Sequence, residues 1–218
     1  MNFQAQSIGR AVWVGLGLTF ALLVLAVLLA QLRFQSQAGQ PLPVYGQVAG
    51  FTLTNQAGQA VSLADLSGRV WVADIIFTRC PGPCLRMTRQ MRELQLGLPA
   101  DSQARLVSLT TDPDFDSPPV LSRYAERFGA QSGRWLFLTG TKKQIADLAI
   151  DSLKLTAIAK KPEERQSPQD LFVHSTIFVL VDKKARLRGV FETGGEEVDW
   201  TQMKDRIMKA VRRLERET

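Results

Sequence analysis

The chain has 218 residues, 45% hydrophobic and 22% charged, which suits one globular domain with an appendage and excludes disorder or a collagen-like repeat. Two cysteines are too few for a disulfide scaffold, a four-cysteine zinc site or an iron–sulfur cluster, and a single histidine excludes multi-histidine metal sites. The net charge of +6 includes no dense basic run before the last predicted helix, so we expect no nucleic-acid partner.

A long apolar segment comes near the start of the chain. Residues 11–32 carry no charge, and as a helix they would span roughly 33 Å, enough to cross the hydrocarbon core of a bilayer. We therefore predict a short N-terminal tail (1–10) followed by one transmembrane anchor (11–32). The alternative is a cleaved signal peptide, for which the small residues at 36–38 offer a cleavage site.

The charges that flank this segment give a weak signal of orientation. Arg10 precedes it and Arg33 follows it, and the positive-inside rule marginally favours a cytoplasmic N-terminus. We predict a linker at 33–46, because residues 35–46 are uncharged and contain glycine and two prolines. The domain at 47–218 is then expected on the periplasmic side of the cell membrane. Thiols there oxidise unless they are kept reduced or bound to metal.

The first elements of the soluble part are β-structures. Residues 51–54 and 60–63 flank a turn at Gly58 and predict a hairpin. Residues 70–78 form a nearly continuous apolar run, as expected of a buried central strand. Asp74 interrupts this run, and we interpret it as a hydrogen-bonded carboxylate rather than a group with a direct role.

Helix-type and strand-type segments alternate through the rest of the chain. They are a helix from Leu85, a strand at 105–110, a helix at 117–128, a strand at 135–138, a helix at 142–155, strands at 172–181 and 187–191, and a helix at 198–216. This order predicts an α/β fold with a mixed sheet and helices on both faces. The basic residues of the last helix are interpreted as a solvated face, with contact to anionic lipid as the alternative.

Two cysteines sit where the central strand gives way to a helix. An offset of four residues brings Cys80 and Cys84 together if helical geometry begins near Cys80. A helix N-terminus stabilises thiolates, so we expect their pKa values to be lowered. Pro81 and Pro83 are tolerated in a first helical turn and stiffen the loop.

His174 supplies a third candidate ligand about ninety residues later. It lies near the start of its strand, so it reaches the cysteine loop only if that strand runs antiparallel to residues 70–78. A site with two sulfurs and one nitrogen suits copper, because thiolates favour Cu(I) and imidazole binds copper or zinc. A structural zinc site normally has four protein ligands, whereas a three-coordinate copper site could exchange its metal, as a carrier must.

Other interpretations of these residues stay open. The cysteines could form a structural disulfide, although a short loop leaves little unfolded-state entropy to remove. They could also form a purely redox pair. His174 could be a structural residue without a role in chemistry.

Several segments resemble one known family. The sequence FTRCPGPC at 77–84 resembles the cysteine motif of the Sco (SenC) family of membrane-anchored copper-binding proteins. Residues 107–118, 136–141 and 172–177 are similar to its Ser-x-Asp-Pro loop, its Leu-Thr-Gly segment and the segment that carries its histidine. Gly82, inside the cysteine motif, departs from the family pattern, which often has an acidic residue there, and Leu85 replaces the usual proline after the motif.

The resemblance implies a thioredoxin-like fold at 47–218 that binds Cu(I) or Cu(II) through Cys80, Cys84 and His174. It also implies a copper metallochaperone that helps to assemble the CuA centre of cytochrome c oxidase subunit II. Its other expected partner is a periplasmic copper donor or a thiol reductant. The alternative is a membrane-anchored thiol–disulfide oxidoreductase in which Cys80 attacks and Cys84 resolves the mixed disulfide. A redox sensor is a third hypothesis, and whether the chain is an enzyme stays open.

Overall fold

A computed structural model describes residues 13, 15–29, 31, 41–80, 82–164, 172–195 and 197–217, with the backbone alone at 157–159, 162 and 172–174. The chain divides into two compact units, Met1–Pro41 and Leu42–Thr218.

In the first unit, residues 15–29 form a helix whose side chains are exposed and mostly apolar. Among the described residues, no helix combines the length and the apolar character needed to cross a bilayer. The predicted tail at 1–10, parts of the predicted anchor at 11–32 and most of the predicted linker at 33–46 lie outside the described residues.

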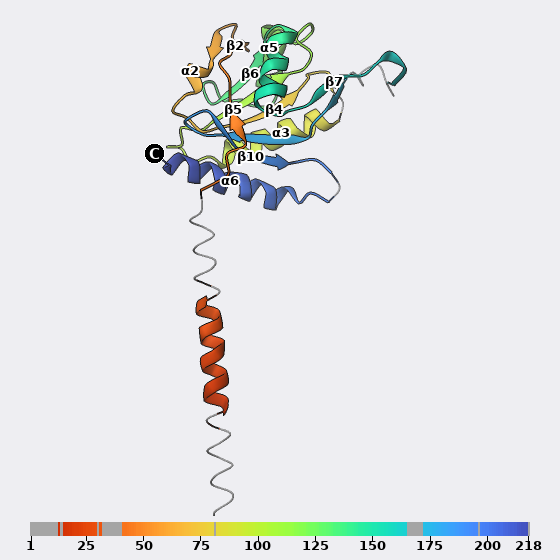
Figure 1. Cartoon of the computed structure of the whole chain (residues 1–218). Helices are drawn as coiled ribbons and strands as arrows, with labels where there is room; N and C mark the ends of the chain where they lie inside the picture. Colours follow the sequence, from red (N-terminus) through yellow and green to blue (C-terminus); the bar gives the residue numbers. More distant parts are fainter. Residues whose placement is uncertain are drawn as a thin grey trace, which may run out of the picture. The chain divides into compact units, whose positions relative to one another are not determined.

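The second unit is built around the strand β4 (Trp71–Ile76), all six residues of which are buried (Figure 1). β4 pairs in parallel with β5 (Arg105–Thr110) on one side and antiparallel with β9 (Ile177–Val181) on the other. Both faces of β4 are covered, which explains why its sequence is apolar almost without interruption. The predicted central strand is confirmed. Its neighbour β9 runs antiparallel to it, which is the direction that the sequence analysis required if His174 is to reach the cysteine loop.

The described residues form one eight-stranded mixed sheet in the order β1-β10-β9-β4-β5-β6-β2-β3. Its remaining strands are β1 (Gly46–Gln47), β2 (Thr52–Asn55), β3 (Ala60–Ser62), β6 (Trp135–Thr139) and β10 (Arg186–Glu192). The predicted hairpin is present as β2 and β3, and Gly58 adopts a φ of 76° in its turn. This backbone conformation favours glycine, because a Cβ would be strained there.

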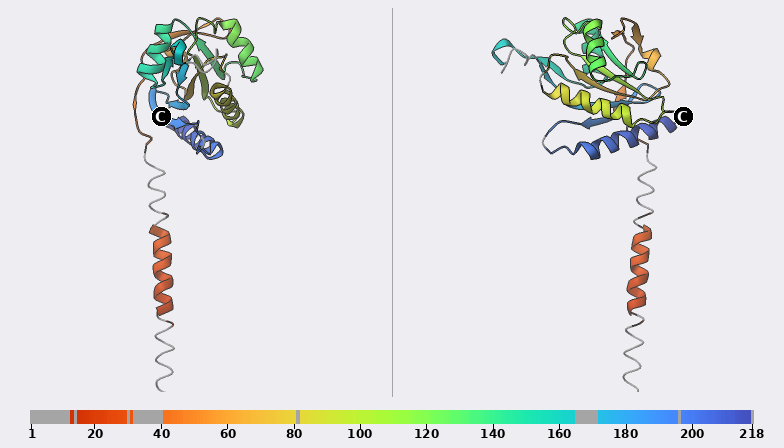
Figure 2. Two further views of the ribbon diagram at one scale, coloured as in Figure 1. Left: turned by 90° about the vertical axis from the view of Figure 1, so that its right-hand side faces the viewer. Right: turned by 180° about the vertical axis from the view of Figure 1, so that it is seen from behind.

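Helices cover both faces of the sheet, as predicted (Figure 2). The helices α3 (Pro83–Gly97), α4 (Pro118–Arg127) and α6 (Trp200–Arg216) pack on one face around a core that includes both cysteines. The other face packs against α2 (Leu63–Leu66) and α5 (Lys142–Ala146) in a separate apolar cluster. The cysteine pair therefore belongs to the core beneath α3, α4 and α6.

Two predicted elements differ from the structure. The helix expected at 142–155 ends its α-helical part at Ala146 and continues as a π-helix, η1 (Asp147–Ser152). The strand expected at 172–181 is broken in two, because Ser175 donates its backbone N–H to Thr156 while Thr176 accepts one from Thr193. At this point the chain changes its pairing partner.

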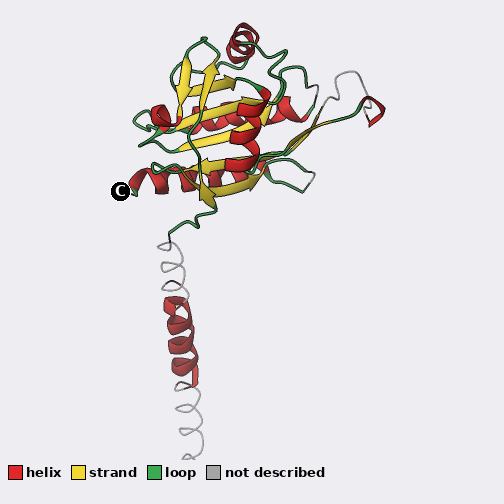
Figure 3. Cartoon of the chain, turned by 45° about the horizontal axis from the view of Figure 1, so that its top comes forward, coloured by secondary structure: helices red, strands yellow, loops and turns green. Residues whose placement is uncertain are grey.

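The first half of that broken strand belongs to a small second sheet. β8 (Phe172–His174) pairs antiparallel with β7 (Ala157–Ala159), a strand that the sequence analysis did not anticipate (Figure 3). A 3₁₀ turn, η2 (Pro162–Glu164), follows β7. His174 is thus carried by this two-stranded sheet and not by β9.

Candidate metal and thiol site

The two cysteines lie at the junction between β4 and α3. Cys80 ends a turn in which its backbone N–H donates to the carbonyl of Phe77 at 3.2 Å. Gly82 occupies the N-cap of α3, and Pro83 opens the helix, so Cys84 falls in its first turn. A proline is accepted there because the first helical N–H groups have no intrahelical partner. Pro81 lies outside the described residues.

Both thiols are buried and they contact one another. Cys80 is 6% exposed and Cys84 is fully buried. Burial raises the pKa of the Cys84 thiol, and the hydrogen bond and charge of Cys80 raise it further. The sequence analysis expected a lowered pKa at this helix N-terminus, and for Cys84 that expectation is wrong. The helix dipole stabilises a negative charge at an exposed helix N-terminus by about 0.3–1 kcal/mol. This is too little to offset the hydration that a thiolate loses when it is buried.

Polar groups of the core surround Cys84. The Thr88 hydroxyl donates to the Cys84 carbonyl at 2.7 Å and lies 2.9 Å from the Tyr124 hydroxyl. Asp74 is fully buried on β4. Burial is the main cause that raises the pKa values of Cys84 and Tyr124, and the negative charge of Asp74 adds to both shifts. The Asp74 carboxylate therefore acts on the thiol electrostatically, a role that the sequence analysis gave to no residue.

The loop before Cys80 is held by an aspartate from the neighbouring loop. Asp116, which is fully buried, accepts hydrogen bonds from the Thr78 backbone N–H at 3.1 Å and from the hydroxyls of Thr78 and Thr110. Burial raises the pKa of Asp116, and these three hydrogen bonds offset part of that shift. The carboxylate clamps the end of β4 to the end of β5 and so fixes the start of the cysteine loop.

A second contact between the same loops lies nearer the surface. The Arg79 guanidinium pairs with Asp112 and stacks over the ring of Phe115, whose centroid is 4.0 Å away. Sequence reasoning did not identify these loop residues as parts of the site. The signal was present, because the segment 107–118 was among those that resemble the known family.

The structure describes the backbone of His174. Its partner in the β7–β8 sheet is Ala157, and the following residues connect it toward α3. Thr176 is bonded to Thr193, whose carbonyl accepts from the Gln90 side chain of α3 at 3.0 Å. The chain just after β8 is thus tied to the helix that begins with the cysteine motif.

The two thiols that the structure describes suit a thiophilic metal. Two adjacent thiols in the core suit Cu(I), which prefers soft sulfur ligands. Within the described residues, no group of three or more His, Cys, Asp and Glu side chains is placed so that it could hold a metal ion. The third ligand expected from the sequence, the imidazole of His174, lies outside what the structure describes.

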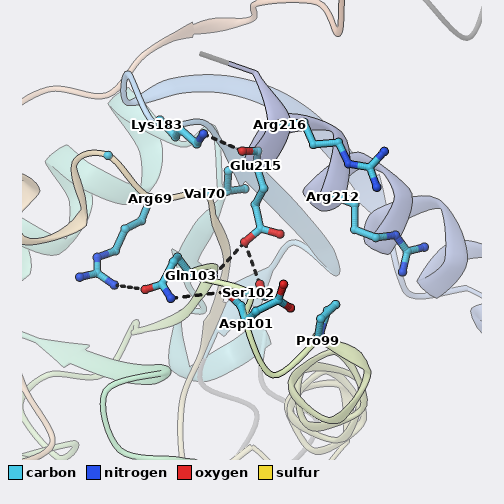
Figure 4. A pocket seen from close by; sticks show the side chains of 11 residues that line it. Arg69, Val70, Pro99, Asp101, Ser102, Gln103, Lys183, Arg212, Glu215 and Arg216 are labelled. Carbon is cyan, nitrogen blue, oxygen red and sulfur yellow. Dashed lines mark hydrogen bonds between the residues drawn. The ribbon is translucent and has the colours of Figure 1, made fainter.

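A cavity of about 440 Å³ lies apart from the cysteines, at the opposite end of α3 and beside the end of α6. Its lining includes Arg69, Lys183, Arg212 and Glu215 (Figure 4). The Glu215 carboxylate accepts from the Ser102 hydroxyl at 2.8 Å and from two backbone N–H groups, so it serves to fasten a loop. The cavity contains neither thiol, and we assign it no part in the chemistry.

Comparison with known proteins identifies relatives of this chain. A family model described as SCO1/SenC matches residues 43–211. An SCO1 protein homologue of Bacillus subtilis is 40% identical over 141 residues, which cover 64% of this chain and 70% of that protein. A protein of Stutzerimonas stutzeri proposed to bind copper is 30% identical over 150 residues, covering 68% of this chain and 70% of that protein.

Solved structures share the thioredoxin-like mixed α/β fold. A SCO1/SenC family lipoprotein of Bacillus anthracis superimposes with a TM-score of 0.66 at 28% identity, covering 79% of this chain and 96% of that one. BsSco, a member of the Sco family of cytochrome c oxidase assembly proteins in which a disulfide switch was identified, gives a TM-score of 0.63 at 34% identity. That match covers 79% of this chain and 98% of BsSco.

Proposed function

Because this chain belongs to the SCO1/SenC family, we propose that it binds copper and helps to assemble cytochrome c oxidase. In this proposal Cys80 and Cys84 are the sulfur ligands, His174 is the nitrogen ligand, and the acceptor is the CuA site of oxidase subunit II. The observation that carries the proposal is the buried pair of thiols in mutual contact at the start of α3. The copper-binding and oxidase-assembly roles of the relatives support it.

The environment of the thiols suits a cargo metal. Both thiols must lose their protons to bind Cu(I), and the raised pKa of Cys84 makes that loss unfavourable without the metal. Copper binding is therefore expected to release protons and to be stronger at higher pH. Transfer to the acceptor proceeds by ligand exchange, in which thiolates of the acceptor replace those of this chain and the oxidation state of copper is unchanged.

An anaerobic Cu(I) titration of the reduced full chain in detergent tests the ligands. X-ray absorption should show about one copper with two sulfur neighbours and one nitrogen neighbour. Cys80→Ser and Cys84→Ser should each abolish tight binding, and His174→Ala should remove the nitrogen neighbour. Met87→Leu is the matched control, because it removes a buried sulfur beside the pair while nearly preserving core volume. Unchanged copper affinity in both Cys80→Ser and His174→Ala contradicts the proposal.

A second candidate function is favoured by the contact between the thiols. Two hydrogen-bonded cysteines four residues apart can interconvert with a disulfide, and a disulfide switch was identified in BsSco. In this alternative Cys80, the more exposed cysteine, attacks the disulfide of an exported or oxidase target, and Cys84 resolves the mixed disulfide. Exchange with a disulfide substrate should survive His174→Ala, whereas copper coordination through nitrogen should not.

The apolar N-terminal segment belongs to the same proposal. We infer that residues 11–32 anchor the chain in the cell membrane by a single pass and that the domain after the linker lies on the periplasmic side. The uncharged sequence supports this topology. Two C-terminal fusions test this topology, one to a reporter that is active only in the periplasm and one to a reporter that is active only in the cytoplasm. Activity of the periplasmic reporter is expected, and activity of the cytoplasmic reporter contradicts the topology.

A further inference from the structure

Five exposed arginines lie on the two helices beside the cysteine pair. They are Arg86, Arg89 and Arg92 of α3 together with Arg123 and Arg127 of α4. We call these five residues the arginine ridge.

The two helices that carry the ridge are joined to one another near the thiols. α3 and α4 are fastened together by the contact between the hydroxyls of Thr88 and Tyr124 at 2.9 Å and by the bond from the Gln95 amide to the Gly129 carbonyl at 2.9 Å. Arg89 follows Cys84 by five residues, which is about 7.5 Å along the helix axis. A protein seated on the ridge is therefore adjacent to the cysteine loop.

The arginines of the ridge outnumber the two acids of the same helices, Glu93 of α3 and Glu126 of α4. Within the part of the chain that the structure describes, none of the five arginines forms an ion pair. Exposed lysines elsewhere do, since Lys142 pairs with Asp114 and Lys143 with Asp147. The acid of α3, Glu93, is already engaged by Lys204 and by the indole N–H of Trp200. The ridge thus presents a net positive charge to solvent.

The composition of this surface is that of a protein contact. Leu96 of α3 lies two helical turns after Arg89, on the same side of the helix, and is 64% exposed. Arginine is enriched at protein interfaces, where its planar guanidinium binds carboxylates in a bidentate manner, while lysine is depleted there. An exposed leucine among arginines gives the apolar contact that a purely solubilising charged face lacks.

We propose that the arginine ridge is the docking surface for an acidic face of the protein that receives the copper. This inference rests on the proposed function for the identity of the acceptor, oxidase subunit II. Carboxylates around the acceptor's metal site would pair with the ridge, and their attraction would speed the encounter between the two proteins. Docking on α3 and α4 would bring the acceptor's thiolates next to Cys80, the more exposed cysteine of the pair.

The test compares two charge reversals of equal size in the full chain. Arg89→Glu with Arg92→Glu alters the ridge, and Arg212→Glu with Arg216→Glu alters the basic cavity at the other end of the domain. Association of the metal-free chain with the purified CuA domain of subunit II is measured by stopped flow at several salt concentrations. Copper stoichiometry and near-ultraviolet circular dichroism are recorded for every variant.

The ridge variant should keep its copper and its fold but associate about tenfold or more slowly, with a weaker dependence on salt. The cavity variant should associate like the original chain. Three results would overturn the docking surface. The two charge reversals could slow association equally, the ridge variant could associate as fast as the original chain, or the original chain could fail to associate at all. Failure of the proposed function is separate, because the copper titration detects it without the acceptor.

Discussion

Cys80 and Cys84 differ in how much of each residue is exposed to water. Cys84 is fully buried with a raised pKa, while Cys80 keeps 6% exposure at the end of its turn. We predict that iodoacetamide modifies Cys80 of the reduced, metal-free chain before Cys84. The rate at Cys84 should rise about tenfold per pH unit through the neutral range without levelling off, because the thiolate alone reacts.

Peptide mass spectrometry after timed quenching measures both rates. The same reaction in urea is the control, since both thiols should react alike once the chain is unfolded. Preferential labelling of Cys84 in the folded chain, or a plateau in its rate below pH 8, contradicts the role assigned to burial.

Asp74 supplies a second prediction at the residue scale. Its negative charge raises the pKa of Cys84, so Asp74→Asn should lower that pKa and accelerate alkylation of Cys84 severalfold at a fixed pH. The substitution keeps the shape of the side chain. Asp65→Asn, on α2 of the other sheet face, removes the same charge far from the thiols and should leave the rate unchanged. Equal rates in Asp74→Asn and in the original chain exclude an electrostatic role for Asp74.

At the scale of elements, one carboxylate joins the ends of β4 and β5. Asp116→Ala removes the carboxylate that accepts hydrogen bonds from Thr78 and Thr110. A buried donor that is left without a partner lowers the free energy of unfolding by about 1–3 kcal/mol. We predict a loss of about 2–4 kcal/mol in the free energy of unfolding, measured with urea, together with faster hydrogen exchange at the Thr78 amide. Asp114→Ala, an exposed acid in the same loop, should change stability by less than about 1 kcal/mol.

The sequence predicted some elements better than others, for identifiable reasons. The central strand could be predicted because its burial on both faces leaves a continuous apolar run, and the β2–β3 hairpin because Gly58 marks its turn. The break at Ser175 could not, since residues 172–181 look like one strand and the change of partner depends on Thr156 and Thr193, which are distant in sequence. Local patterns carry no record of such tertiary hydrogen bonds.

The candidate site shows the same division. Residue type and spacing sufficed to bring Cys80 and Cys84 together, because they depend on one local turn. The pKa of Cys84 was predicted in the wrong direction, since the helix position is visible in the sequence but the depth of burial is a property of the assembled core. The imidazole of His174 remains a predicted ligand that the titration described above must test.

At the scale of the whole domain, one buried ion network closes the fold. Arg188 on β10 is 2% exposed and pairs with Asp182 at 2.6 Å and with Glu217 at 2.9 Å. Its guanidinium also donates to the carbonyl of Leu42 at 2.8 Å. The network therefore connects the first residue of the domain, the β9–β10 hairpin and the end of α6, so it should report on global rather than local unfolding.

Burial opposes the ionisation of Asp182, but hydrogen bonds from Arg186, Arg188 and Lys184 outweigh it and lower the pKa of this carboxyl. An acid with a lowered pKa in the folded state contributes stability above its unfolded value, near 3.9, and loses that contribution as the pH falls through the folded value. The original chain should thus lose free energy of unfolding as the pH falls below about 4. Asp182→Asn should cost about 3–5 kcal/mol at pH 7, because Arg188 keeps its charge in a buried position with Glu217 as its remaining carboxylate.

Urea unfolding followed by the near-ultraviolet signal of the buried Trp71 and Trp135 measures both effects. The stability difference between the two chains should shrink as the pH falls from 5 toward 2, because protonation of Asp182 removes what the substitution removes. Asp205→Asn, in an exposed pair with Lys209, should follow the original chain at every pH. A difference that stays constant across this range places the cost of Asp182→Asn in packing rather than charge, and would contradict the network as the closure of the domain.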